Sequence, residues 1–148
     1  MFFERLRRRT VLRAVVFLLL LVLCGLPFLT KATIWRIYLA GADRAYHADR
    51  LEEAERLYKL AVTKAEAFGP TDPRLALCLN NLAGLYYDRG KYDRAEALFE
   101  RALVIDEKAL GPDSGVIAED LNNLAALYRK RGKYDQAELL YKRSLKIS

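Results

Sequence analysis

The sequence predicts an all-α protein in which a single N-terminal transmembrane helix precedes an α-solenoid of about three helix pairs. Residues 79–106 and 121–148 align at an offset of 42 residues, and 18 of the 28 aligned positions are identical. Apolar residues within each copy recur at helical spacing. An uncharged apolar run, residues 14–29, comes before the repeats. Repetition at this period indicates stacked helical units that share one core and present surfaces for partners.

Each of the two copies divides into a pair of helices at a glycine. In the middle unit, one apolar stripe runs from Leu79 to Tyr86 and a second runs from Tyr92 to Leu103. Gly90 lies between the two stripes, where it predicts a tight turn. The repeating unit is therefore predicted to be a helical hairpin.

The ends of the second helices carry their own signals. Gly-Pro pairs at 69–70 and 111–112 are predicted to end a helix, because glycine adopts the left-handed cap and proline cannot continue the hydrogen-bond ladder. Asp72 is then predicted to cap the next helix, with Pro73 in its first turn. The connections between units are thus short and defined.

The order of large, small and aromatic residues resembles the tetratricopeptide repeat, in the 42-residue form found in kinesin light chains. The resemblance implies helix pairs whose first helices line a groove, and a role in protein recognition. The matching residues of the middle unit are Leu79, Leu82, Ala83, Tyr86, Gly90, Ala95, Phe99 and Ala102, and those of the last unit are Leu121, Leu124, Ala125, Tyr128, Gly132, Ala137, Tyr141 and Ser144.

A more divergent copy, residues 35–70, precedes the units at 73–112 and 115–148. Its second helix places Ala54 and Tyr58 at the packing positions of the repeat. Three units are the usual minimum for a stable stack. The first copy is therefore interpreted as a degenerate repeat that caps the N-terminal end of the solenoid.

The first helix of this degenerate repeat is predicted at residues 35–49. Gly41 stands where the repeat has a large residue, and Asp49 stands where it has glycine. Both departures weaken the family pattern in this helix without changing the expected hairpin.

The N-terminal segment is predicted to cross a membrane. Residues 1–13 hold five Arg against one Glu and form a basic arm, and residues 14–34 are assigned to a transmembrane signal-anchor helix. The positive-inside rule places the arm in the cytoplasm and the repeats across the inner membrane, in the periplasm of a bacterium. The rest of the chain carries 20 Lys and Arg against 18 Asp and Glu, so the basic balance does not indicate a nucleic-acid partner.

Two fates of this segment stay open. Retention is favoured because no small-x-small cleavage motif follows Leu29 promptly, and Trp35 with Tyr38 is predicted to mark the far membrane interface. Cleavage as a signal peptide would instead leave an exported, soluble repeat protein.

Catalytic chemistry has little support in the composition. His47 is the single histidine, Cys24 lies in the apolar run, and Cys78 is predicted to be a buried thiol. Carboxylates such as the pair at 106–107 are predicted to lie on solvated, charge-paired helix faces. No enzyme activity, catalytic residue, cofactor or metal site is expected.

The family resemblance implies that one stripe on the first helices meets a peptide. The asparagines can hydrogen-bond a peptide backbone, and the basic pair can meet a carboxylate. The alternative is that these side chains only satisfy neighbouring helices or face solvent. The stripe residues are Asn80, Tyr87, Asp88, Asn122, Arg129 and Lys130.

The last helix is predicted to leave an apolar surface uncovered at Tyr141, Leu145 and Ile147. A partner or a second copy of the chain would cover this surface, or it is tolerated as a modest exposed patch. The leading functional hypothesis is a non-catalytic accessory or assembly subunit of a membrane protein complex. A tethered adaptor for soluble peptides or protein tails, and the exported soluble protein, are the alternatives.

Overall fold

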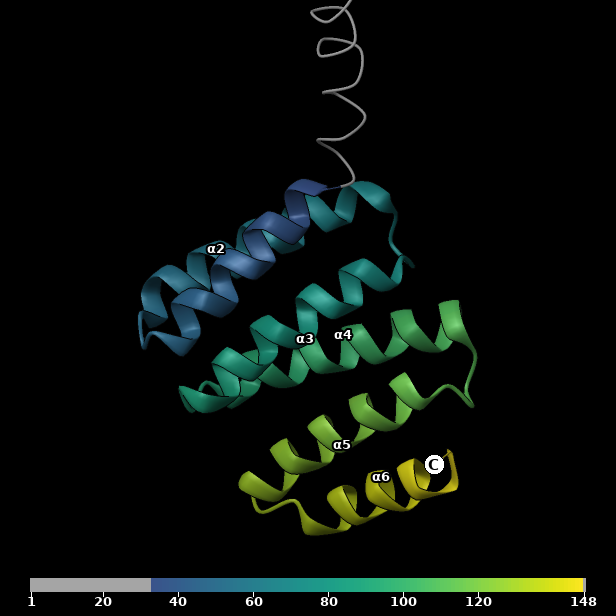
Figure 1. Cartoon of the computed structure of the whole chain (residues 1–148). Helices are drawn as coiled ribbons and strands as arrows, with labels where there is room; N and C mark the ends of the chain where they lie inside the picture. The colour runs from purple at the N-terminus through teal and green to yellow at the C-terminus, as the bar shows by residue number, and fades with distance from the viewer. Residues whose placement is uncertain (1–32, 148) are drawn as a thin grey trace, which may run out of the picture. The chain divides into compact units, whose positions relative to one another are not determined.

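The computed structural model describes residues 33–147, and the chain from Trp35 onward forms one compact unit. The described residues form six helices, stacked in chain order as three hairpins (Figure 1). The predicted α-solenoid of about three helix pairs is confirmed. The helices are residues 33–47, α2 (Leu51–Ala65), α3 (Pro73–Asp88), α4 (Tyr92–Leu110), α5 (Gly115–Lys130) and α6 (Tyr134–Ile147), with a 3₁₀ turn, η1 (Glu66–Phe68), after α2.

The stack is held by contacts between helices that follow one another in the chain. α3 packs on α4 and α5 packs on α6 within hairpins, while α2 packs on α3 and α4 packs on α5 between hairpins. The tight turns within the second and third hairpins lie at one end of the stack, and the loops that join hairpins lie at the other (Figure 1). Each repeat therefore leans on its neighbours.

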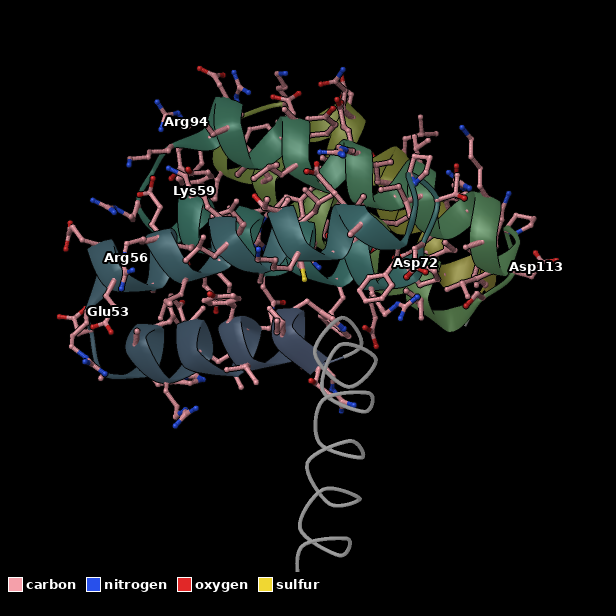
Figure 2. All side chains as sticks on the ribbon, turned by 90° about the horizontal axis from the view of Figure 1, so that it is seen from above. Glu53, Arg56, Lys59, Asp72, Arg94 and Asp113 are labelled. Atoms are coloured by element: carbon pink, nitrogen blue, oxygen red, sulfur yellow. The ribbon has the colours of Figure 1, made fainter. Side chains whose placement is uncertain are left out.

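The predicted loop caps are present. Asp72 caps α3 by accepting a hydrogen bond from the Arg74 backbone N–H at 2.9 Å, and Pro73 is the first helical residue. Ser114 caps α5 in the same way, accepting from the Val116 N–H at 3.4 Å. Asp72 and Asp113 mark the loop end of the stack in Figure 2.

The tight turns share a left-handed residue. Gly90 and Gly132 have φ values of 68° and 74°, as a helix C-terminus followed at once by another helix requires. In the first hairpin the same place is taken by Asp49, with φ 56°, and its helix ends at residue 47, two residues before the predicted end. Asp tolerates this conformation better than most residues with a side chain.

Matched ion clusters bridge the hairpins near these turns. Glu55 of α2 accepts a hydrogen bond from Arg89 Nη1 at 3.0 Å. Its pKa is lowered to about 2, mainly by the hydrogen bond that it accepts from Lys59. One repeat later, Glu96 of α4 is bound by Arg131 in the same arrangement. Because these carboxylates are partly buried and multiply bonded, they help fix the register between repeats.

Trp35 corrects one prediction. It lies buried with Ala61, Ala65 and Cys78 in an apolar cluster, and Tyr38 packs partly buried against the same cluster. The expected position at a membrane interface is therefore wrong for Trp35, because its helix turns the indole into the core of the stack. Cys78 is a buried free thiol, as predicted, and burial raises its pKa to about 12.

The predicted basic arm and almost all of the predicted transmembrane segment, residues 1–32, lie outside the described residues. Within residues 33–147, none of the helices combines the length and the apolar character that crossing a membrane requires.

Candidate functional site

A groove of about 370 Å³ opens between α3 and α5, next to the last turns of α4. It adjoins the loop end of the stack, since Pro73 starts α3 and Leu110 ends α4. Three aliphatic side chains, Leu77, Leu110 and Val116, line it and stay partly open to solvent. Its polar lining comes from all three helices: Asn80, Asn81, Asp106, Glu119, Asp120 and Asn123.

Three of these polar side chains form the acidic floor of the groove, defined as Asn80, Asp106 and Asp120. Asp106 is 3% exposed and Asp120 is 2% exposed. Asn80 Nδ2 donates to Asp120 Oδ1 at 2.6 Å. Three acceptors, one oxygen on each side chain, have no hydrogen-bond donor among the described residues: Asn80 Oδ1, Asp106 Oδ1 and Asp120 Oδ2.

The two carboxyl groups of the floor are electrostatically coupled. Burial, followed by the charge of Asp120, raises the pKa of Asp106 to about 7. Burial also raises the pKa of Asp120, against the hydrogen bonds that this side chain accepts from Asn80 and Asp106. The pair therefore takes up a proton more readily than an isolated carboxyl group, and it loses that proton as the pH rises through the raised pKa of Asp106.

The burial of Asp106 contradicts the prediction that the 106–107 pair lies on a solvated face. Asp106 follows Ala102 by four residues and Leu103 by three, and both are buried. It therefore continues the inward stripe of α4 by one more turn. Asp120 likewise precedes the buried Leu121 on α5, and neither carboxylate was predicted to belong to a site.

The sequence itself matches a known family over most of its length. Residues 32–108 and 79–148 each match the tetratricopeptide repeat. The chain belongs to the tetratricopeptide repeat family. Tetratricopeptide repeats are generally non-catalytic modules that bind protein partners. No curated protein shows significant sequence similarity to the chain.

Solved structures show the same fold. BtubC (BKLC) from P. vanneervenii superposes with a TM-score of 0.74 and 28% identity, covering 79% of this chain and 46% of that one. The tetratricopeptide repeat domain of Arabidopsis FLU gives 0.68 and 22%, covering 78% and 94%. A putative kinesin light chain from Podosopora anserina gives 0.68 and 23%, covering 76% and 54%. The chain thus spans less than half the length of the BtubC chain.

The residues of the stripe predicted from the tetratricopeptide repeat pattern have different surroundings. Asn80 alone lines the acidic groove. Tyr87 packs its ring on Tyr92, with centroids 5.9 Å apart, and Asp88 accepts a hydrogen bond from Tyr46 Oη. The remaining stripe residues are exposed side chains on α5: Asn122, Arg129 and Lys130.

The predicted surface of the last helix is narrower than expected. Leu145 is 77% exposed, but Tyr141 and Ile147 are partly buried, and Ile147 packs against the main core of the repeats. Tyr134 and Leu139 are exposed on the same helix. The exposed apolar side chains of α6 are therefore separated along its length.

The site residues that the sequence reasoning missed are Asp106, Asp120, Asn81 and Asn123. For Asp120, the repeat itself contained a signal. Cys78 occupies the position of Asp120 one repeat earlier, and a charged residue that replaces a small apolar one at a core position marks a polar site. Within the part of the chain that the structure describes, no group of three His, Cys, Asp or Glu side chains is placed to hold a metal ion.

Proposed function

We propose that this chain is a non-catalytic scaffold, anchored in the inner membrane by residues 14–34, that binds a partner protein through its tetratricopeptide repeats. In this proposal it serves as an accessory or assembly subunit of a membrane protein complex. The observation that carries the proposal is the stack of three repeats with an open, polar groove between α3 and α5.

The N-terminal sequence supports the membrane anchor. Residues 14–29 hold no charged side chain, and residues 1–13 carry a net charge of +4. Positive charge before a single apolar span keeps the N-terminus in the cytoplasm, so the repeats lie on the far side of the membrane. The partner is accordingly a protein, or part of one, that is exposed outside the cytoplasm.

Contacts within the lipid would add to those of the repeats. A membrane-embedded partner would meet the apolar segment within the bilayer and the repeats outside it. Once one of these two contacts has formed, the other forms within the same complex at a high effective concentration. Two weak contacts together therefore give tight binding. We therefore rank a stoichiometric membrane subunit above a tethered adaptor for soluble tails.

The tethered adaptor is the second candidate, and the acidic groove favours it. The groove lies in a range of volumes that suits one or a few side chains of a bound segment rather than a whole domain. In this case the apolar helix serves only as a membrane anchor and does not contact the partner. Cleavage of the N-terminal segment would instead give an exported soluble form. Self-association through α6 is a further alternative.

Topology is tested by a reporter fused after Ser148. The fusion should be active only outside the cytoplasm, and replacing Arg7, Arg8 and Arg9 with Glu should weaken or invert the result. An unmodified fusion that is active in the cytoplasm contradicts the orientation.

Co-purification from native membranes in mild detergent separates the candidates. A stoichiometric integral-membrane partner supports the accessory subunit, and soluble prey supports the adaptor. Recovery of a fragment that lacks residues 1–29 supports cleavage and export. The absence of any specific partner at native expression level contradicts the scaffold itself.

A further inference from the structure

The acidic floor occupies repeat positions that are apolar one repeat earlier. Asp120 corresponds to Cys78 at the 42-residue offset. Asp106 corresponds to Ala65, because α2 and α4 align on the buried pair Ala54 and Ala95. Asn80 corresponds in the same alignment to an apolar residue of the first helix, Leu39. At the junction of the first two repeats, these apolar side chains belong to one packed cluster.

The fold therefore does not require polar side chains at these three positions. Buried carboxyl groups cost free energy unless charge and hydrogen bonds compensate them. At the second junction compensation is incomplete, because Asn80 Oδ1, Asp106 Oδ1 and Asp120 Oδ2 lack donors among the described residues. Unsatisfied acceptors at the floor of an open groove point to a ligand that brings donors.

The walls of the groove differ from its floor. Leu77, Leu110 and Val116 are between 40% and 47% exposed, and each presents aliphatic surface to the groove. A ligand that fits both parts has an apolar stem and a cationic head. A lysine side chain has a four-carbon stem and an ammonium group with three N–H donors, which equals the number of unsatisfied acceptors.

The charges around the floor favour a cation. Glu119 on α5 and Glu107 on α4 act on Asp120 as further negative charges. The residues that α3 contributes, Asn80 and Asn81, are uncharged. Arg143 of α6 is bound to Glu107 and neutralises part of this field. Glu119, which also lines the groove, adds a negative charge beside the floor.

An ammonium group fits better than a guanidinium group. Arginine prefers a carboxylate with both oxygens free, so that two parallel hydrogen bonds form. Asp120 Oδ1 is already bonded to Asn80, and one buried oxygen of each carboxyl group, Asp106 Oδ1 and Asp120 Oδ2, is left without a donor. A compact group with three N–H donors suits three acceptors on separate side chains.

We propose that the groove between α3 and α5 holds a lysine side chain of the partner protein, with its ammonium group among Asn80, Asp106 and Asp120. The inference rests on the proposed function, because it names the chemistry that the repeats recognise. The lysine ammonium supplies the missing donors, and its stem packs between Leu77, Leu110 and Val116.

The test uses the full chain in non-ionic detergent, with its Leu and Val methyl groups labelled for NMR. The probes are acetylated, amidated serine heptapeptides whose central residue is Lys, Arg, norleucine or Glu. The Lys peptide should shift the methyl signals of Leu77, Leu110 and Val116 saturably at pH 8. It should bind at least tenfold more tightly than the norleucine peptide and severalfold more tightly than the Arg peptide, while Leu75 at the first junction stays unchanged.

Lowering the pH to 6 should weaken the binding of the Lys peptide severalfold, because the proton returns to the carboxyl pair and competes with the ammonium. The variant Asp106→Ala with Asp120→Cys copies the first junction and should abolish the preference for Lys while the repeats stay folded. Equal binding of the Lys and norleucine peptides, or no saturable shift with any peptide, means that the pair holds only a proton and water, and overturns the inference.

The same variant separates this inference from the proposed function in native membranes. If the wild-type chain co-purifies with a partner and the variant loses it, the lysine site is supported in its native setting. If both recover the partner equally, the lysine site is wrong and the scaffold remains. If the wild-type chain recovers no partner, the scaffold fails, and the peptide titration alone decides whether the groove binds lysine.

Discussion

The two junctions between neighbouring repeats use the same helix contacts and opposite core chemistry. The first junction buries Ala65 and Cys78 in an apolar cluster, whereas the second places Asp106 and Asp120 at the corresponding positions. Both keep the same peripheral ion cluster, centred on Glu55 in one and Glu96 in the other. The difference indicates that the ion clusters and the surrounding apolar residues suffice for stacking.

The polar junction also differs in how it responds to protons. The first junction holds one carboxylate beside its apolar cluster, Asp43, which accepts hydrogen bonds from Tyr58 and Asn81. The second junction instead holds a carboxyl pair with raised pKa values. Proton uptake by this pair is therefore local to the groove. Any effect of pH between about 5 and 8 that depends on Asp106 and Asp120 should leave the first junction unchanged.

The largest effect is expected when the polar chemistry is moved to the apolar junction. Ala65→Asp with Cys78→Asp would bury two carboxyl groups beside Trp35, where Leu39 offers no amide to one of them. The free energy of unfolding should fall on the order of 3 to 5 kcal/mol. Urea unfolding of the full chain in non-ionic detergent, followed by circular dichroism at 222 nm, measures the loss.

A matched control places two carboxylates on exposed residues of α2 that lie outside the groove. Thr63→Asp with Lys64→Asp should change the free energy of unfolding far less, within about 1 kcal/mol. If the buried and exposed pairs lower the free energy of unfolding equally, the first junction is not the buried apolar cluster described above.

A smaller effect of opposite sign is expected when the second junction is made apolar. Asp106→Ala with Asp120→Cys removes two desolvated carboxyl groups and restores the residues of the first junction. At pH 8 the free energy of unfolding should rise by about 1 to 4 kcal/mol in reducing buffer. Such a gain would show that Asp106 and Asp120 do not stabilise the fold.

The gain should depend on pH, with a sign set by the raised pKa of Asp106. A carboxyl group ordinarily titrates near pH 4, and Asp106 titrates at about 7 in the folded state. Between these values the folded chain binds more protons than the unfolded chain, so wild-type stability falls as pH rises through this window. The variant should lose that slope. A gain that is equal at pH 5 and pH 8 contradicts the raised pKa of Asp106.

The sequence was sufficient to predict the helices and their ends. Apolar stripes at helical spacing, glycine at the turns and an Asp-Pro helix start act within a few residues, so local chemistry decides them. The caps at Asp72 and the turn at Gly90 follow from such short-range signals. The repeat itself then defined how the hairpins stack.

The acidic floor could not be predicted in this way, because its members come from three helices. Asp106 lies two residues before the exposed Lys108 and resembles a surface residue until α5 covers it. Asn80 was assigned to a peptide-binding stripe, but its amide is engaged by Asp120 of the next repeat. Trp35 likewise resembled an interfacial residue, and only the packing of Ala61 and Ala65 revealed it as core.

The smallest effect separates the turn of the first hairpin from the other two. Asp49 and Gly90 occupy the same left-handed position, with φ values of 56° and 68°. Asp49→Gly relieves backbone strain in the folded state, but it also increases the conformational entropy of the unfolded chain. The free energy of unfolding should therefore rise by only about 0.5 kcal/mol. Gly90→Asp should lower it by about 0.5 to 1 kcal/mol, and through backbone strain alone, because a Cβ at Gly90 meets no other atom within 4 Å. Urea unfolding of both variants beside the wild type tests the pair, and a loss of stability in Asp49→Gly shows that the Asp49 side chain stabilises its turn.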